Sequence, residues 1–478
     1  MINLKVKIKN FKSIGSTELN LKSGLNILIG PNGSGKTCLL SSLKFIRDLF
    51  VFGAAQALAR NGGARRVYRR NSRTISFSLT YDYGERIFQR RRWPCQLSWE
   101  IVMSQSGPEG IAVIIRERVN IIADINGRKR TLFRYRVDRS NVSRTRTGIH
   151  LVKPNEFGRD LFSIWDERFA DDTKQKLYED FTNKLLRNVV KQTRENTDMS
   201  IFPLVARIDR KIQELYSLFV LLNEYSILPD IARQSTEQLR YAQMQPNGAG
   251  VSEVIHALER KRFDRIQAGL YYGREEYLSY EPYMFSSFRH RYFRYPWSIL
   301  AKGFGIERNI ENIEGVLEKI NRELSAAVQP IESVTVETDP TNGRRFVVFR
   351  AGKEKFNPEE VSDGTIKWLC ILVSILVPHS PVYLLEEPEN FLHPWMQQRL
   401  IDMMRQHAEQ NDTVFILSSH SSTVLNSTVP AEVLVVNSTT EGTEISQIKN
   451  REEIEQALKR SQFRLGDFWV SGALEGVP

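Results

Sequence analysis

The stretch GPNGSGKTCLL, residues 30–40, separates two segments of different periodicity. The apolar run LNILI (25–29) precedes it, and LLSSLKFIRDLF (39–50) follows with apolar residues at helical spacing. A glycine-rich turn between a strand and a helix is typical of a phosphate-binding loop, because backbone N–H groups and the helix N-terminus face the anion. The sequence therefore predicts a strand–loop–helix unit that holds a nucleotide.

Residues in this stretch match the pattern G-x-x-x-x-G-K-[ST] of a P-loop. We expect Lys36 to reach the outer phosphates of ATP and the Thr37 hydroxyl to bind Mg²⁺. The predicted phosphate-binding residues are Asn32, Gly33, Gly35, Lys36 and Thr37.

A second apolar strand ends in two carboxylates. In PVYLLEEPENFLHP (381–394), Glu386 and Glu387 follow the run VYLL directly. Adjacent glutamates are usually solvated, but after a buried strand in a chain with a P-loop they indicate the second half of a nucleotide site. We expect Glu386 to hold Mg²⁺ and Glu387 to polarise the attacking water.

Two further segments fit the same site. VSDGTIKWLCILVSIL (361–376) begins with Ser362 as a helix N-cap, and the N–H groups near Gly364 offer a second anion site. Since one chain needs only one such site for its own nucleotide, the second suggests a nucleotide held by another copy; a plain helix cap is the alternative. TVFILSSHSSTVL (413–425) places His420 after a strand, where it could touch the γ-phosphate and the catalytic water or be purely structural.

The order of these motifs resembles the ABC-type ATPases of the RecF, SMC and OLD kind, especially the AAA15-type subgroup. The resemblance is strong over residues 1–60 and 355–478, including IKNFKSIGSTELNLKSGLNILIGPNGSGKT and RLGDFWVSGALEGVP. It is looser in the middle, in YSILPDIARQS and PNGAGVSEVIHAL. It implies an α/β ABC-type P-loop NTPase head with a split mixed sheet. It also implies a homodimer, or a higher oligomer, with ATP clamped between the P-loop of one subunit and Ser362 of the other.

Three positions depart from the usual ABC pattern. Val361–Thr365 reads Val-Ser-Asp-Gly-Thr where Leu-Ser-Gly-Gly-Gln is usual, and Glu386 replaces the usual aspartate. Both variants are at home in the OLD-like branch. The glutamine of the Q-loop has two candidates, Gln89 and Gln96.

The chain of 478 residues is expected to have three parts. Residues 1–150 form a first ATPase lobe with a basic antiparallel β region, with strands predicted within 73–119. Residues 151–332 form a mainly helical insertion, with helical spacing in 172–190, 206–228 and 306–328. Residues 333–478 form the second lobe. The aromatic and arginine-rich segment 271–297 could stack bases, dock a protein or build the small core of the insertion.

The charge is uneven. The formal net charge is +11, and residues 60–146 carry 20 Lys and Arg against seven Asp and Glu. Such a region could bind nucleic acid, or it could be a solvated basic face or pair with an acidic protein. Cys38, Cys95 and Cys370 fit no metal spacing, and no apolar run reaches the roughly 18 residues of a membrane span. We therefore expect a cytoplasmic protein with no membrane contact.

Two functions compete. The first is an ATP-driven sensor or regulator of a bacterial anti-phage system that holds a separately encoded effector, a nuclease or toxin. Stand-alone ATPases of the resembled subgroup act in this way in PARIS (AriA) and Septu (PtuA). The 58 residues after His420 contain no D-x-D, so no nuclease module is expected in this chain. The alternative is a RecF-like repair ATPase acting on DNA. A transporter motor is disfavoured by the branch-specific signature.

Overall fold

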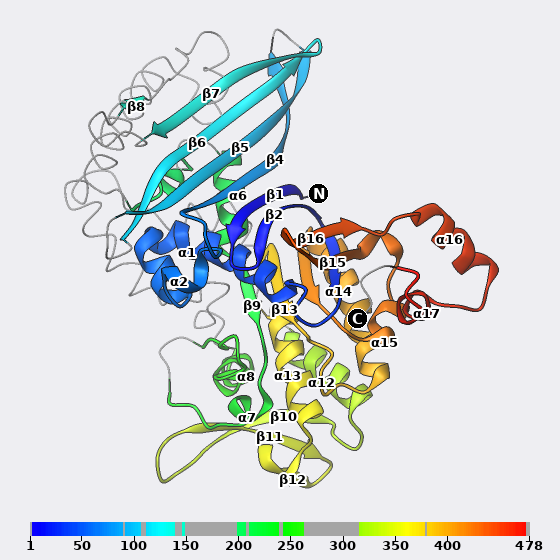
Figure 1. The fold of residues 1–478 in the computed structure, drawn as a ribbon. Helices are drawn as coiled ribbons and strands as arrows, with labels where there is room; N and C mark the ends of the chain where they lie inside the picture. The colour runs from blue at the N-terminus through cyan, green and yellow to red at the C-terminus, as the bar shows by residue number, and fades with distance from the viewer. Residues whose placement is uncertain are drawn as a thin grey trace.

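The computed structural model describes residues 2–88, 91–106, 111–138, 146–148, 198–206, 210–238, 242–261, 315–377 and 380–474. Figure 1 shows three sheets, with long antiparallel strands at one end of the molecule and a parallel sheet near its centre. The predicted helical segment 172–190 and the aromatic and arginine-rich segment 271–297 lie outside the described residues.

The central sheet carries the P-loop strand. Five of its strands are parallel, and only the edge strand β16 runs antiparallel to its neighbour. In spatial order the strands are β16 (Gly442–Gln447), β15 (Val433–Thr439), β3 (Gly24–Ile29), β14 (Val414–Ser418), β13 (Val382–Glu386) and β9 (Asn223–Tyr225).

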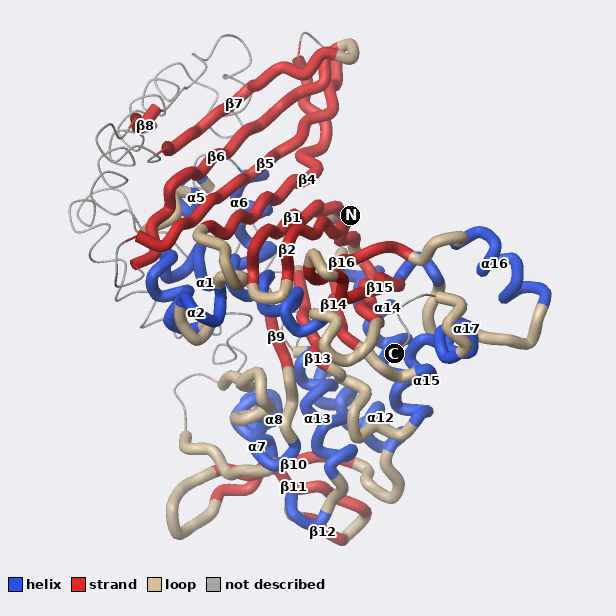
Figure 2. The backbone as a smooth tube through the Cα atoms, viewed as in Figure 1, coloured by secondary structure: helices blue, strands red, loops and turns tan. Residues whose placement is uncertain are grey.

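Both faces of the central sheet are covered. Val382 and Leu384 of β13 point into one buried cluster, and Tyr383 and Leu385 point into another. Parallel strands buried on both faces consist of continuous apolar runs, which explains why VYLL shows no alternation. Helix α1 (Lys36–Arg60) covers the first face, and α13 (Asp363–Leu376) and α14 (Pro394–Asn411) belong to the second cluster. Figure 2 shows helices gathered around this sheet.

The large antiparallel sheet begins at the N-terminus and contains the predicted strands of region 73–119. In spatial order its strands are β2 (Ile14–Lys22), β1 (Asn3–Phe11), β4 (Thr74–Phe88), β5 (Arg91–Ser106), β6 (Ile111–Ile125), β7 (Arg128–Asp138) and β8 (Arg146–Gly148). Their side chains alternate between buried and more exposed along β1 and β2, as expected for a sheet with one buried face. The strand predictions for this region are confirmed.

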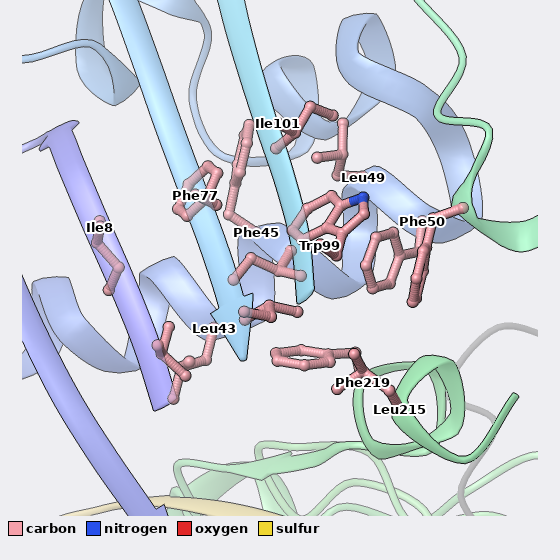
Figure 3. Close-up of a cluster of buried hydrophobic side chains, with 14 of the residues drawn as sticks. Ile8, Leu43, Phe45, Leu49, Phe50, Phe77, Trp99, Ile101, Leu215 and Phe219 are labelled. Carbon is pink, nitrogen blue, oxygen red and sulfur yellow. The ribbon is translucent and has the colours of Figure 1, made fainter. Parts of the chain in front are cut away.

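Helix α1 lies between the two large sheets. Figure 3 shows its side chains Leu43, Phe45, Leu49 and Phe50 among residues of β1, β4, β5 and α6 (Arg210–Val220). The rings of Phe50 and Trp99 are 4.8 Å apart, edge to face. Because α1 is buried on several sides, the helix that follows the P-loop is fixed rigidly against the sheet that supplies the loop.

One part of the segment predicted as a helical insertion belongs to the central sheet. Helix α6 ends at Val220, and Asn223–Tyr225 then pair with β13 as strand β9. The apolar run 215–222 has helical spacing, but the exposed edge of β13 offers hydrogen bonds that a parallel strand satisfies. The sequence did not anticipate this strand, and the domain boundaries stay a prediction.

The other elements surround these layers. The third sheet comprises β10 (Ser333–Thr338), β11 (Arg345–Ala351) and β12 (Glu354–Phe356). Within the described residues, the remaining helices are α2 (Ala64–Val67), α5 (Phe202–Val205), α7 (Pro229–Ala232), α8 (Val251–Glu259), α12 (Val316–Ala327), α15 (Ser422–Asn426), α16 (Arg451–Arg460) and α17 (Leu465–Val470), with 3-10 turns at Pro358–Glu360 and Pro430–Glu432. Within the described ranges, no helix combines the length and apolar character needed to cross a membrane.

Candidate nucleotide-binding site

The P-loop connects β3 to α1 and packs against the C-terminal hairpin β15–β16. Gly35 has φ 109°, and a Cβ atom there would collide with the Thr443 side chain. A Cβ atom on Gly30 would collide with the Val436 carbonyl oxygen. These two glycines are therefore required by the close approach of strands that lie about four hundred residues away in the sequence.

Lys36 lies inside this loop. Its side chain is buried, and Nζ donates to the carbonyl oxygens of Gly30 (2.8 Å) and Pro31 (2.9 Å). Burial lowers the pKa of Lys36, while the Glu387 carboxylate raises it. Asn32, Gly33 and Thr37 are exposed. A buried ammonium beside exposed loop residues is suited to bind an anion that enters from solvent.

The two predicted metal ligands are in contact. The Thr37 hydroxyl donates to Glu386 Oε1 at 2.5 Å. The contact forms because β14 alone separates β3 from β13, and parallel strands end at one edge of the sheet. The described residues contain no group of three or more His, Cys, Asp or Glu suited to a metal. One hydroxyl and one carboxylate fit Mg²⁺, which usually keeps water and substrate phosphates as its other ligands.

Glu387 and His420 also meet at this edge. His420 Nε2 lies 3.6 Å from Glu387 Oε1, and Asn390 Nδ2 donates to Glu387 Oε2 at 2.7 Å. Glu387 has φ 43°, a strained region for a residue with a side chain. Its N–H donates to the Ser418 carbonyl oxygen at 3.1 Å, which ties the loop after β13 to the end of β14. Strain at a carboxylate beside a histidine is typical of functional sites.

The surroundings favour a neutral His420. Burial lowers the pKa of His420 first, the Lys36 cation lowers it further, and Glu387 opposes both. A neutral imidazole near a carboxylate can accept or donate a proton at neutral pH. The pair can therefore orient and deprotonate a water molecule.

Glu389 was given no role from the sequence. Its carboxylate is 4% exposed, and Oε1 accepts from the Ser419 hydroxyl (2.6 Å) and from the His420 N–H (3.0 Å). Oε2 is buried without a hydrogen-bond partner among the described residues. Burial raises the pKa of Glu389. The only sequence signal was an acidic residue within the segment PENFLHP, in which solvation is the usual expectation.

The segment Val361–Thr365, the signature segment, lies at the start of α13. Ser362 is the N-cap and accepts from the Thr365 N–H at 3.2 Å. A Cβ atom on Gly364 would lie 2.6 Å from the Phe391 carbonyl oxygen. Within the described residues, Ser362 bonds Thr365 of its own helix, and Gly364 lies against the loop after β13. In this part of the chain, no hydrogen bond joins these two residues to the P-loop of their own chain.

Of the two Q-loop candidates, the structure describes only Gln96, and it is not brought to the site. Gln89 lies outside the described residues. Gln96 lies within β5, opposite Asp82 of β4 and Ile122 of β6. By topology, the strand beside β13 is β9, so the segment after Tyr225 reaches the nucleotide edge instead.

Comparison with known families agrees with this geometry. A family described as "AAA domain" matches residues 5–267, more than half of the chain. The chain belongs to this AAA-domain family. A second family, described as "AAA domain, putative AbiEii toxin, Type IV TA system", matches residues 273–426. The AAA-domain assignment agrees with the α/β fold predicted for a P-loop NTPase head.

Curated relatives of this AAA-domain chain include DNA-repair proteins. It is 38% identical over 63 residues to the DNA double-strand break repair Rad50 ATPase of Methanopyrus kandleri, covering 13% of the chain and 7% of the relative. It is 27% identical over 107 residues to the DNA replication and repair protein RecF of Actinobacillus succinogenes, covering 22% and 25%. The chain thus spans a quarter or less of the length of these relatives.

Solved structures to which this chain shows some similarity include heads of Smc proteins. An Smc head bound to the C-terminal winged-helix domain of ScpA is 12% identical, with a TM-score of 0.43 and coverage of 94% of this chain and 98% of that one. An Smc head with an extended coiled coil from Pyrococcus furiosus is 15% identical, with a TM-score of 0.41 and coverage of 96% and 99%.

Proposed function

We propose that this AAA-domain chain binds ATP with Mg²⁺ and hydrolyses it. The observation that carries the proposal is the convergence of Lys36, Thr37, Glu386, Glu387 and His420 on one edge of the central sheet. These residues come from three adjacent parallel strands and include every chemical type that phosphoryl transfer to water requires.

Each residue has a separate role in the proposed reaction. Lys36 and the loop N–H groups hold the phosphates, and Thr37 with Glu386 holds the metal ion. Mg²⁺, when bound, neutralises charge on the phosphate oxygens. Glu387 accepts a proton from the attacking water at Oε1, and His420 Nε2, 3.6 Å away, orients the same water.

The position of the signature segment supports a homodimer. Among the described residues, no hydrogen bond joins Ser362 to the P-loop of its own chain, and Gly364 lies against Phe391, so both suit the nucleotide of a second copy arranged head to tail. In this proposal ATP joins two heads, hydrolysis releases them, and the output is a change of shape. Larger assemblies can be built from the same dimer.

For the biological role, we favour a sensor or regulator subunit of an anti-phage defence system. The match of residues 273–426 to a family named for a toxin of a type IV toxin–antitoxin system supports this role. The effector in this proposal is a separate nuclease or toxin. The ATPase cycle would hold the effector in one state and release it in the other.

The test uses a trapped ATP state. Glu387→Gln should bind ATP and hydrolyse it roughly 10²–10⁴-fold more slowly, the usual cost of losing a general base. Glu354→Gln, on exposed strand β12, is the matched control and should hydrolyse ATP normally. Tagged Glu387→Gln, expressed with its neighbouring genes intact, should co-purify with a stoichiometric effector when ATP is present. Normal turnover by Glu387→Gln would refute the assignment of the base.

A RecF-like function on DNA is the second candidate, and the antiparallel sheet favours it. Arg118 of β6 lies directly opposite Arg136 of β7. Burial lowers the pKa of Arg118 most, and the charges of Arg136 and Arg116 lower it further. Asp138 pairs with Arg116 and Arg136, and Glu100 lies opposite Arg118, so two carboxylates offset part of the charge of these three arginines. Like charges opposite each other destabilise a sheet, so the remaining positive charge suits a polyanion. Nucleic acid as the only co-purifying partner, lost at moderate salt and absent for Arg118→Ala, would favour this candidate.

A further inference from the structure

We propose that Arg233 positions the signature segment and neutralises its aspartate, so that the segment can engage the nucleotide of a partner subunit. Arg233 lies in YSILPDIARQS, a segment to which neither the sequence nor the ATPase chemistry gave a role. The inference rests on the proposed ATP-dependent dimer and adds a residue that the dimer needs in order to form with ATP.

All three guanidinium nitrogens of Arg233 bond this segment or the turn before it. Nε donates to the Pro358 carbonyl oxygen (2.9 Å), and Nη2 donates to the Val361 carbonyl oxygen (2.8 Å). Nη1 donates to Asp363 Oδ1 at 2.5 Å. The Arg233 side chain is only 15% exposed, so these charge-assisted bonds are partly shielded from water. A planar fork with three fixed acceptors specifies one conformation of residues 358–363.

Asp363 explains why such a cation is needed. The usual ABC signature has glycine at this position, whereas Asp363 places a carboxylate in the first turn of α13, beside Ser362 and Gly364. The N–H groups of this turn are the proposed contact for the γ-phosphate, and a second anion there repels it. Arg233 offsets that charge and turns the carboxylate toward α7. The departure from the usual signature is therefore matched by a second residue that accommodates it.

Arg233 also connects the signature segment to the nucleotide edge of its own chain. Strand β9 pairs with β13, the strand that ends at Glu386, and α7 follows β9 after three residues. The connection is fixed by two backbone hydrogen bonds, from Ser226 to Pro246 and from Leu228 to Asn247. Arg233 is the C-cap of α7. A shift of β9 at the nucleotide edge would therefore move the signature segment through a short, rigid path.

The experiment compares Arg233→Ala with Arg344→Ala, a control that removes an exposed arginine paired with Glu237 at 3.0 Å. Binding of a fluorescent ATP analogue to the monomer should be unchanged in both, because the P-loop is untouched. ATP-dependent dimerisation in the Glu387→Gln background should be lost for Arg233→Ala only. With Glu387 intact, Arg233→Ala should lower kcat about 10²-fold, the cost of misplacing one element of a site by about 1 Å.

Two further variants separate positioning from simple destabilisation. Asp363→Gly added to Arg233→Ala should restore part of the dimerisation, because it removes the unneutralised carboxylate. Mixing Arg233→Ala with Lys36→Ala should regain hydrolysis above the sum of the two alone. The mixed dimer has one site with an intact P-loop from the first chain and an intact signature segment from the second. An Arg233→Ala chain that is merely misfolded cannot give this recovery.

The outcomes distinguish this inference from the proposed function. If the wild-type chain forms no dimer with ATP, the proposed function fails first. If the wild type dimerises and Arg233→Ala dimerises equally well, or the mixture recovers nothing, Arg233 has no positioning role. Should Arg233→Ala fail to fold, the same comparison is made with Arg233→Lys, which keeps the cation but lacks the planar fork whose separate nitrogens reach the three acceptors. Unimpaired dimerisation of that variant would overturn the inference.

Discussion

Glu389 offers a sharp test of how the site is held together. Its Oε1 atom accepts from Ser419 Oγ at 2.6 Å and from His420 N at 3.0 Å, in a position that is 4% exposed. Glu389→Ala removes the acceptor and leaves two donors buried, whereas Glu389→Gln keeps a carbonyl oxygen of the same shape. The pair of variants therefore separates the hydrogen bonds from the charge.

The magnitude follows from the two donors. A buried donor left without a partner costs roughly 1–3 kcal/mol, and a hydroxyl can rotate to limit its own loss. We expect Glu389→Ala to lower the local stability of residues 418–421 by about 2–4 kcal/mol, and Glu389→Gln by less than about 1 kcal/mol. Hydrogen exchange of the peptide that contains His420 measures this opening directly. Equal protection of this peptide in the two variants would refute the role of the hydrogen bonds.

The charge of Glu389 allows a second, independent test, the dependence of stability on pH. Burial raises the folded-state pKa of Glu389 above its usual value, so the ionised carboxylate is less favourable in the folded chain than in the unfolded one. The stability contributed by this group is fully present below the unfolded pKa and is lost as pH rises through the folded pKa. Glu389→Gln does not titrate, so its stability relative to the wild type should increase between acidic and neutral pH. Chemical denaturation of both proteins across that range measures the difference, and a decreasing relative stability would contradict the assignment.

Three further substitutions test other parts of the site. Lys36→Ala should abolish nucleotide binding, as measured by equilibrium titration, because no other cation is bonded within the loop; retained affinity would disprove the phosphate contact. Ser362→Arg should leave binding intact but block ATP-dependent dimerisation, and dimers seen by light scattering would exclude a signature acting on the partner. Gly35→Ala should lower both thermal stability and nucleotide affinity, because the new Cβ atom would collide with Thr443 and φ is 109°. A variant with wild-type thermal stability would show that the hairpin β15–β16 moves to make room for the methyl group.

The sequence predicts those parts of the site that are encoded locally. The P-loop glycines and Lys36 lie within eight residues, and Glu386 and Glu387 directly follow a buried strand, so spacing alone indicates their chemistry. The strands of the antiparallel sheet are likewise visible from their composition and alternation. In each case, the residues that carry the pattern are the same short stretch of chain whose structure it predicts.

Contacts between distant segments could not be predicted. Arg233 bonds Asp363 across 130 residues, and Gly35 approaches Thr443 across about four hundred. Strand β9 has three residues, and its pairing depends on the free edge of β13 rather than on its own propensity. Glu389 has the same local environment as any acidic loop residue until the end of β14 is packed against it. Such residues become visible only when the fold supplies their partners.

The loop after β13 and helix α13 of one chain are in direct contact. Lys367 of α13 is buried, and its Nζ donates to the Glu387 carbonyl oxygen at 3.0 Å. Burial lowers the pKa of Lys367 to about 8, against the opposing effect of Glu389 and Glu387, so the side chain is still mostly protonated at pH 7. One turn earlier, Gly364 lies against Phe391. In the proposed head-to-tail dimer, Glu387 serves the nucleotide of its own chain and the signature segment serves that of the partner. In this dimer a change at Glu387 would reach the second site through the Lys367–Glu387 hydrogen bond and helix α13, without crossing the dimer interface.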